Sequence, residues 1–108
     1  MSFTMEEFKQ IDAAEAKRLM DTESGYQIVD VRTEDEFEEG HIKGAICIPN
    51  ETIGLGVRQT LTDPEQMLLV YCRSGVRSVM AAEKFCMLGY KNVIEFGGII
   101  DWPYEIEE

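Results

Sequence analysis

The sequence predicts an α/β domain built on a parallel sheet. Short apolar runs alternate along the chain with segments of helical periodicity, and this alternation is typical of parallel strands joined by helices. The chain has 108 residues, the common size of one domain, so we expect residues 1–108 to form a single domain. With 44% hydrophobic residues, the chain is able to bury one core.

Five segments have the composition of strands. The run at residues 67–71 is the most hydrophobic, so we expect it to lie centrally in the sheet, where both faces are covered. Gly25 precedes the second segment and Pro49 closes the third, as expected of residues that interrupt regular structure. The expected strands are residues 8–11, 26–31, 45–48, 67–71 and 93–96.

Helical segments lie between these strands, and two of them begin with capping signals. Asp12 with Glu15, and Thr33 with Glu36, have the spacing of a capping box, in which each side chain bonds the backbone N–H of the other residue. Gly40 should end the second helix. The expected helices are residues 13–24, 34–39, 51–60, 78–88 and 99–102.

The charge and the cysteines exclude several classes of protein. A net charge of −11 repels nucleic acid and anionic membranes, so we expect neither as a partner. The sequence has no long apolar run and no basic segment followed by an apolar one at its start, so we expect no membrane span and no secretory signal. The three cysteines lack the spacing of a zinc site. Free thiols fit a reducing cytoplasm, which is the expected location.

The Cys72 loop, residues 72–78, is the segment that carries chemistry. It lies between a buried strand and a helix, which in a parallel sheet is the edge where ligands bind. The backbone N–H groups of such a loop and the helix dipole stabilise an anion, here the thiolate of Cys72. Arg73 and Arg77 add positive charge, and Gly75 lets the backbone turn beside the anion. Such surroundings lower the pKa of a thiol from its ordinary value of ~8.5.

We therefore interpret Cys72 as an ionised nucleophile. This interpretation expects a small electropositive pocket that leaves the sulfur exposed, and a sulfur walled off from solvent would contradict it. Cys47 lies in an apolar run and Cys86 lies in the middle of a helix, and neither has comparable cationic neighbours. We expect both of them to be packing residues.

Three blocks of the chain resemble the rhodanese superfamily. The blocks, in the order of the family's signatures, are Asp30-Val31-Arg32 with Glu36-Phe37, His41-Ile42-Lys43-Gly44-Ala45 and Ile48-Pro49; then Cys72 through Ser78; then Ala81-Ala82, Gly89-Tyr90, Asn92-Val93, Gly97-Gly98 and Trp102. The resemblance implies a rhodanese-like fold, with a parallel sheet of about five strands and helices on both of its faces.

The resemblance also implies an activity, the transfer of a sulfur atom. The outer sulfur of thiosulfate or of another persulfide donor would move onto Cys72, and this transient persulfide would pass to cyanide or to a thiol. No metal and no organic cofactor is implied. The partners implied are a small anionic sulfur donor and a thiol acceptor or thioredoxin-like protein. The residues expected to bind the anion are Arg73, Ser74, Gly75, Val76, Arg77 and Ser78.

Three further residues receive structural interpretations. Asp30 should tie down neighbouring backbone, Arg32 should pair with Glu36, and His41, the only histidine, should position a turn. The stretch from Val93 to Gly97 is one residue shorter than the usual family pattern, which leaves the choice of substrate open more than the chemistry.

Two other functions compete with a sulfurtransferase. Phosphatases and arsenate reductases use a similar cysteine loop, but the phosphatase pattern places five residues between cysteine and arginine. Here four residues separate Cys72 from Arg77, and Ser78 occupies the arginine position. The second alternative is a persulfide carrier or a sensor module, which would share the same site without turnover.

Overall fold

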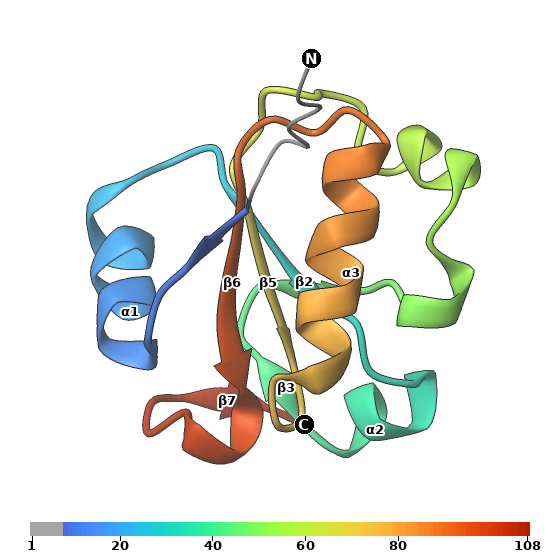
Figure 1. The fold of residues 1–108 in the computed structure, drawn as a ribbon. Coiled ribbons are helices and arrows are strands. Elements are labelled where there is room, and N and C mark those ends of the chain that lie inside the picture. Colours follow the sequence, from blue (N-terminus) through green and yellow to red (C-terminus); the bar gives the residue numbers. More distant parts are fainter. Residues whose placement is uncertain (1–7) are drawn as a thin grey trace.

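The computed structural model describes residues 8–108 and shows a mixed α/β arrangement around one five-stranded sheet (Figure 1). The strand order is β1-β6-β5-β2-β4, and every neighbouring pair is parallel. The elements are β1 (Lys9–Gln10), α1 (Ala13–Thr22), β2 (Gln27–Asp30), α2 (Glu34–Glu39), β3 (His41–Ile42), β4 (Ala45–Cys47), β5 (Leu68–Cys72), α3 (Val76–Met87), β6 (Val93–Gly98) and β7 (Ile106–Glu107), with the 3₁₀ helices η1 (Asn50–Thr52), η2 (Leu55–Gln59) and η3 (Ile99–Asp101).

Helices cover both faces of the sheet. Figure 1 shows α1 on one side and α3 on the other, and each packs on its own apolar cluster. Phe85 of α3 packs with Val70 and other residues on one face, while Ala16 of α1 packs with Leu69 and Ile94 on the opposite face. The alternate sides of the strands therefore supply two cores, and the predicted fold class is confirmed.

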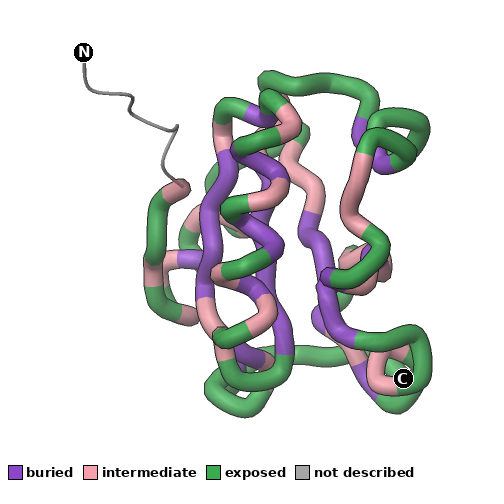
Figure 2. The backbone as a smooth tube through the Cα atoms, turned by 45° about the vertical axis from the view of Figure 1, so that its right-hand side comes forward, coloured by how far each residue is buried: buried purple, intermediate pink, exposed green. Residues whose placement is uncertain are grey.

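The most hydrophobic segment forms the central strand, as predicted. All five residues of β5 are buried, and β5 has β6 on one side and β2 on the other. In Figure 2 the strands are mostly buried, whereas exposed residues recur along the outer side of α3. This arrangement fixes the carboxyl end of β5, at Cys72, in the middle of the sheet edge.

The helix boundaries depart from the prediction at several points, and the predicted last helix, residues 99–102, is the 3₁₀ helix η3, which ends at Asp101. Helix α3 begins at Val76, two residues early, because Gly75 takes the left-handed backbone conformation, with φ of +104°, that lets the chain enter a helix at once. Residues 51–60 form parts of two short 3₁₀ helices instead of one α-helix, and the extended Gly54 separates them. The first helix ends at Thr22, so residues 23 and 24 lie outside it.

One capping box is complete and the other is half formed. Thr33 and Glu36 exchange both bonds, as predicted. Asp12 accepts the N–H of Glu15 at 2.9 Å, but the carboxylate of Glu15 binds Arg18 instead of returning the bond.

The sequence predicts no secretory signal at the start of the chain. Residues 1–7 of that stretch lie outside the part of the chain that the structure describes.

A small two-stranded sheet was missed by the sequence analysis. Strands β3 and β7 pair antiparallel, with His41 opposite Glu107 and Ile42 opposite Ile106. The acidic end of the chain is therefore partly held in a sheet. Figure 1 shows this pair beneath the carboxyl end of the main sheet, beside α2.

Candidate active site

Cys72 is the last residue of β5, and α3 starts only four residues later, at Val76. The Cys72 loop thus has to reverse within three residues, and the positive φ of Gly75 makes this possible. The loop lies at the carboxyl edge of the parallel sheet, the edge at which open α/β folds bind ligands. Its turn aims backbone N–H groups at the sulfur.

The sulfur of Cys72 lies in a cradle of hydrogen-bond donors. The N–H of Gly75 donates to Sγ at 3.0 Å, and Sγ lies 3.4 Å from the hydroxyl of Ser78. Burial raises the pKa of Cys72, but the Ser78 hydroxyl and the backbone N–H groups of Ser78, Gly75 and Ser74 outweigh it, so that the pKa is lowered on balance. The geometry therefore favours a thiolate.

The expectation of an exposed sulfur is wrong. Cys72 is only 1% exposed. The Gly75 nitrogen contacts the sulfur while Gly75 itself is partly exposed, so the sulfur lies directly beneath the backbone of the loop. A nucleophile has to reach its substrate, so a reaction at Cys72 would require the residues of the loop that cover the sulfur to move.

The end of β6 holds the loop closed. The N–H of Ile100 donates to the carbonyl of Arg73 at 3.2 Å. A Cβ atom on Gly98 would lie only 2.0 Å from the same carbonyl oxygen, so only glycine fits between β6 and the loop. This close approach is the physical reason for the burial of Cys72.

The two arginines of the loop have different positions. Arg77 forms a bidentate pair with Glu36 of α2, with N–O distances of 2.7 and 3.0 Å, so its charge is largely balanced. Arg73 is exposed, and so are Ser74 and Val76. The surroundings of Cys72 are therefore less electropositive than the sequence suggested.

A buried network supports the loop from β2. Asp30 accepts the N–H of Arg32 at 2.9 Å and the hydroxyl of Tyr71 at 2.6 Å. Arg32 pairs with Asp30 at 2.6 Å, so the predicted pairing of Arg32 with Glu36 is wrong: two residues along an extended chain are closer than the start of α2. The Tyr71 hydroxyl also accepts the N–H of Ile42, which ties β3 to the central strand.

His41 lies between Gly40 and Ile42, whose backbone groups both bond to this network. Its ring stacks on Phe37, with 3.8 Å between ring centroids, and Nδ1 is 2.9 Å from the Phe37 carbonyl oxygen. Nε2 is 3.7 Å from the carboxylate of Glu107. These contacts hold the turn between α2 and β3, and they bind the end of the chain.

The other cysteines differ from Cys72. Burial, with the nearby carboxylates of Asp30 and Glu34, raises the pKa of Cys47 to about 11. Cys86 is buried in α3 as part of the core cluster. None of the three cysteines forms a disulfide, and the pKa of Cys72 is lowered whereas that of Cys47 is raised.

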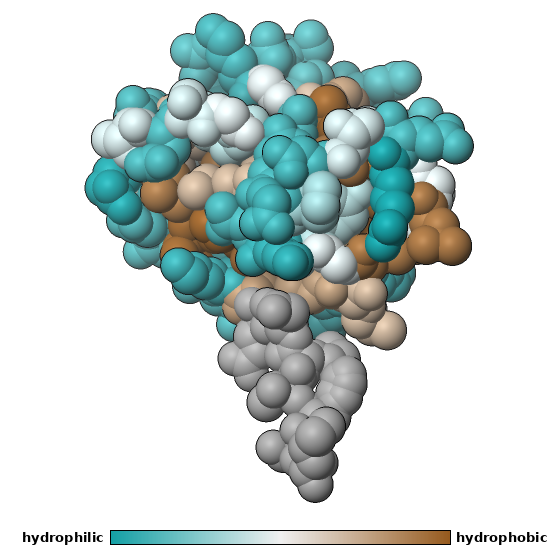
Figure 3. Space-filling view, turned by 90° about the horizontal axis from the view of Figure 1, so that it is seen from above, coloured by the Kyte–Doolittle hydropathy of each residue, from teal (hydrophilic) through white to brown (hydrophobic). Residues whose placement is uncertain are grey.

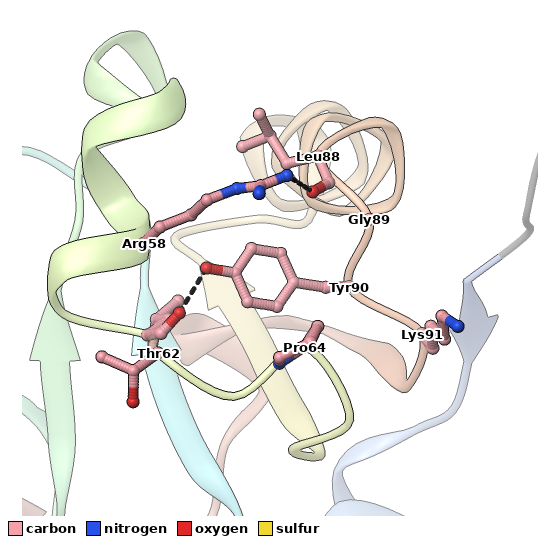
Figure 4. A pocket seen from close by; sticks show the side chains of 8 residues that line it. Arg58, Thr62, Pro64, Leu88, Gly89, Tyr90 and Lys91 are labelled. Atoms are coloured by element: carbon pink, nitrogen blue, oxygen red, sulfur yellow. Dashed lines mark hydrogen bonds between the residues drawn. The ribbon is translucent and has the colours of Figure 1, made fainter.

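A separate pocket of about 250 Å³ lies at the other end of the sheet. Arg58, Pro64 and Tyr90 contribute to its lining (Figure 4). The Tyr90 hydroxyl donates to the carbonyl of Leu61 at 2.5 Å, which joins the segments leading into β5 and β6. Figure 3 looks onto this end and shows a mainly hydrophilic surface with scattered apolar residues. Its position at the amino ends of the strands separates the pocket from Cys72.

The sequence analysis missed one residue of the site, Glu95. Its buried carboxylate lies in β6 and accepts a hydrogen bond from the Ser78 hydroxyl at 2.5 Å. A signal was available, because Glu95 is an acidic residue inside the apolar run at 93–96. A buried acid is uncommon unless it has a partner.

Comparisons with known proteins identify the family of the chain. Residues 12–103 match the family model of the rhodanese-like domain, and the chain belongs to this family. Thiosulfate sulfurtransferase 18 of Arabidopsis thaliana is 38% identical over 105 residues, covering 86% of this chain and 76% of that protein. The thiosulfate sulfurtransferase GlpE of Shewanella oneidensis is 32% identical, covering 91% of this chain and 95% of its own. Both of these relatives are named thiosulfate sulfurtransferases, which supports an enzyme of the sulfurtransferase type.

Other relatives contain the domain as a part. A tRNA uridine(34) hydroxylase of Hamiltonella defensa is 35% identical to this chain, but the match covers only 22% of that protein. Among solved structures, a rhodanese-like domain protein of Staphylococcus aureus is 30% identical with a TM-score of 0.76, covering 93% of this chain and 97% of its own. Within residues 8–108, no helix is long and apolar enough to cross a membrane.

Proposed function

We propose that this chain is a sulfurtransferase that carries sulfur as a persulfide on Cys72. The observation that supports it most is the convergence of neutral donors on one sulfur atom, led by the Gly75 N–H at 3.0 Å from Sγ. The lowered pKa of Cys72, set against burial by hydrogen bonds from Ser78, Gly75 and Ser74, supplies a thiolate. A thiolate is the form that attacks a sulfur–sulfur bond.

The first half-reaction loads the cysteine. The thiolate of Cys72 attacks the outer sulfur of thiosulfate, a new S–S bond forms, and the old bond breaks with its electron pair leaving on sulfite. The N–H groups that hold the thiolate would then hold the charge of the persulfide. Arg73, which is exposed at the mouth of the loop, is the cation available to attract a small anionic donor.

The second half-reaction releases the sulfur. Cyanide or an acceptor thiolate attacks the outer sulfur of the persulfide, and Cys72 leaves as the thiolate. Because Cys72 is 1% exposed, both steps require the loop to move aside for the donor and the acceptor. Local openings of this kind are common at sites that bind ligands.

The length of the loop supports sulfur over phosphate. Helix α3 begins at Val76, so the N–H groups of the Cys72 loop converge on a single atom and leave a small cradle. Ser78 stands where the phosphatase pattern has arginine, and its hydroxyl faces the sulfur at 3.4 Å. The alternative of a carrier without turnover shares this geometry and is separated only by experiment.

The test is thiocyanate formation from thiosulfate and cyanide, together with the intact mass after thiosulfate alone. Turnover and the addition of one sulfur should both disappear in Cys72→Ala, because the nucleophile is gone. Cys86→Ala is the matched control, since Cys86 is buried at 8% exposure away from the loop, and it should keep both. Loading of one sulfur without turnover would mean that the protein is a persulfide carrier and not an enzyme. Phosphate release from a phosphoester without sulfur loading would overturn the proposal.

A further inference from the structure

Glu95 is a buried acid that the sulfur chemistry described above does not use. It is 3% exposed in β6. Its Oε2 accepts the Ser78 hydroxyl at 2.5 Å and the Gly97 N–H at 2.8 Å, and its Oε1 accepts a bond from the Gln10 amide at 3.4 Å. These are neutral partners. Among the ion pairs of residues 8–108, none includes Glu95.

Ser78 connects this acid to the nucleophile. The Cys72 thiol donates to Ser78 Oγ across 3.4 Å, and the Ser78 hydroxyl donates to Glu95 Oε2. A serine hydroxyl has one proton to donate. When the serine hydroxyl donates to Glu95, Ser78 Oγ accepts a hydrogen bond from the neutral thiol of Cys72. When the hydroxyl donates to the sulfur instead, it stabilises the thiolate, and the carboxyl group of Glu95 then has to carry a proton of its own.

We propose that Glu95 is the proton acceptor for Cys72, acting through Ser78. When the thiolate forms, the thiol proton passes to Ser78 Oγ and the serine proton passes to Glu95 Oε2. When sulfur passes to a neutral thiol acceptor, the proton of that thiol stays with the product persulfide and Cys72 leaves as the thiolate, which regains its own proton from Glu95 by the reverse path. Protons and charge balance in both directions.

The surroundings of Glu95 favour moving one negative charge over holding two. The elements packed around it present Gln10 from β1, Ser78 from α3 and Cys72 from β5. The nearest cation along α3, Arg77, is turned to Glu36. Two buried negative charges joined by one hydroxyl repel each other, so the arrangement favours one shared proton between the acid and the thiol.

This inference rests on the proposed function, but its test does not need a sulfur donor. The rate at which iodoacetamide alkylates Cys72 is measured against pH, with peptide mapping to separate Cys72 from Cys47 and Cys86. In the native protein we expect the alkylation rate to fall with pH and then to level off at a residual value. The reason is that transfer of the thiol proton to Glu95 takes place within the protein and does not depend on the pH of the solution.

Two variants should shift the main step in opposite directions. Glu95→Gln removes the competing charge and frees the Ser78 hydroxyl, so the midpoint should fall by about one pH unit. Ser78→Ala removes the donor to the thiolate and keeps the acid, so the midpoint should rise. Both variants should lose the plateau. Unchanged protection of Cys47 and Cys86 shows that the variants are folded.

Other outcomes would overturn the inference. A midpoint that rises in both variants would mean that Glu95 only positions Ser78, and a Glu95→Gln profile equal to the native one would mean that the acid has no part in the ionisation. Thiocyanate formation is recorded separately. If turnover is lost only in Cys72→Ala while the alkylation profiles coincide, the sulfurtransferase stands and the role of Glu95 does not.

Discussion

Replacing Gly98 by alanine should push the Cys72 loop away from the end of β6. The added Cβ would lie 2.0 Å from the oxygen of Arg73, 2.4 Å from its carbonyl carbon and 2.6 Å from the Cα of Ser74. All three atoms are backbone, so no side chain can rotate to make room. The carbonyl oxygen of Arg73 would have to move by about 1.4 Å to reach an ordinary contact of 3.4 Å with the new Cβ atom.

This displacement acts on the donors that hold the sulfur. A misplacement of ~1 Å at a reacting centre costs on the order of 100-fold in rate, so we expect Gly98→Ala to lower thiocyanate turnover by about that factor. The ionisation of Cys72 should move to higher pH as the Gly75 N–H leaves Sγ. Overpacking should also lower the free energy of unfolding by about 1–3 kcal/mol.

The assay compares turnover, the pH profile of Cys72 alkylation and urea unfolding in two variants. Gly56→Ala is the control, because a Cβ on Gly56 meets nothing within 4 Å. The control should match the native protein in all three measurements. Native turnover and an unchanged alkylation profile in a folded Gly98→Ala would refute the claim that β6 sets the geometry of the loop.

Two further predictions concern the residues around the loop. The Arg77 hydrogen bond, opposed by burial and aided by Thr33, holds the pKa of Glu36 at about 2, below its ordinary 4.5. Because the pKa of Glu36 is lower in the folded state, its carboxylate stabilises the fold above pH 4.5, and this stabilisation is lost as the pH falls to about 2. Glu36→Gln should therefore flatten the decline of the free energy of unfolding between these pH values. Equal declines in the variant and the native protein, measured by urea unfolding, would contradict this. Tyr71→Phe leaves the Ile42 N–H without its partner and removes one of the hydrogen bonds to Asp30 Oδ2, which Arg32 still contacts, and it should cost about 1–3 kcal/mol. Urea unfolding at neutral pH measures it, and native stability would count against the network.

The features that short segments determine were predictable from the sequence. The capping box of Thr33 and Glu36 is complete, and the first half of the box at Asp12 also forms, because these bonds are made within three residues. The apolar run at 67–71 became the central strand β5, because only a strand covered on both faces favours so many apolar residues in succession. The family resemblance added the parallel sheet of five strands.

Pairings between distant segments were not predictable in the same way. Arg77 meets Glu36 across 41 positions of the chain, and the sequence offers 21 acidic residues as candidates. His41 lies opposite Glu107, although nothing in the acidic end of the chain marks it as a strand. The burial of Cys72 depends on Gly98, whose role is visible only when β6 is placed beside the loop.

The site therefore stabilises its sulfur by other means than the sequence suggested. Two arginines beside Cys72 indicated stabilisation by charge, yet Arg77 is balanced by Glu36, and hydrogen bonds from Ser78, Gly75 and Ser74 are what lower the pKa of the thiol against its burial. Neutral dipoles fixed in a buried cradle hold a charge without neutralising it. In the proposed reaction the sulfur would thus keep its negative charge for the attack, and Arg73, exposed outside the cradle, would meet the donor. In the proposed enzyme the short loop leaves room for one sulfur atom, and the exposed charge of Arg73 attracts the anionic donor that delivers it.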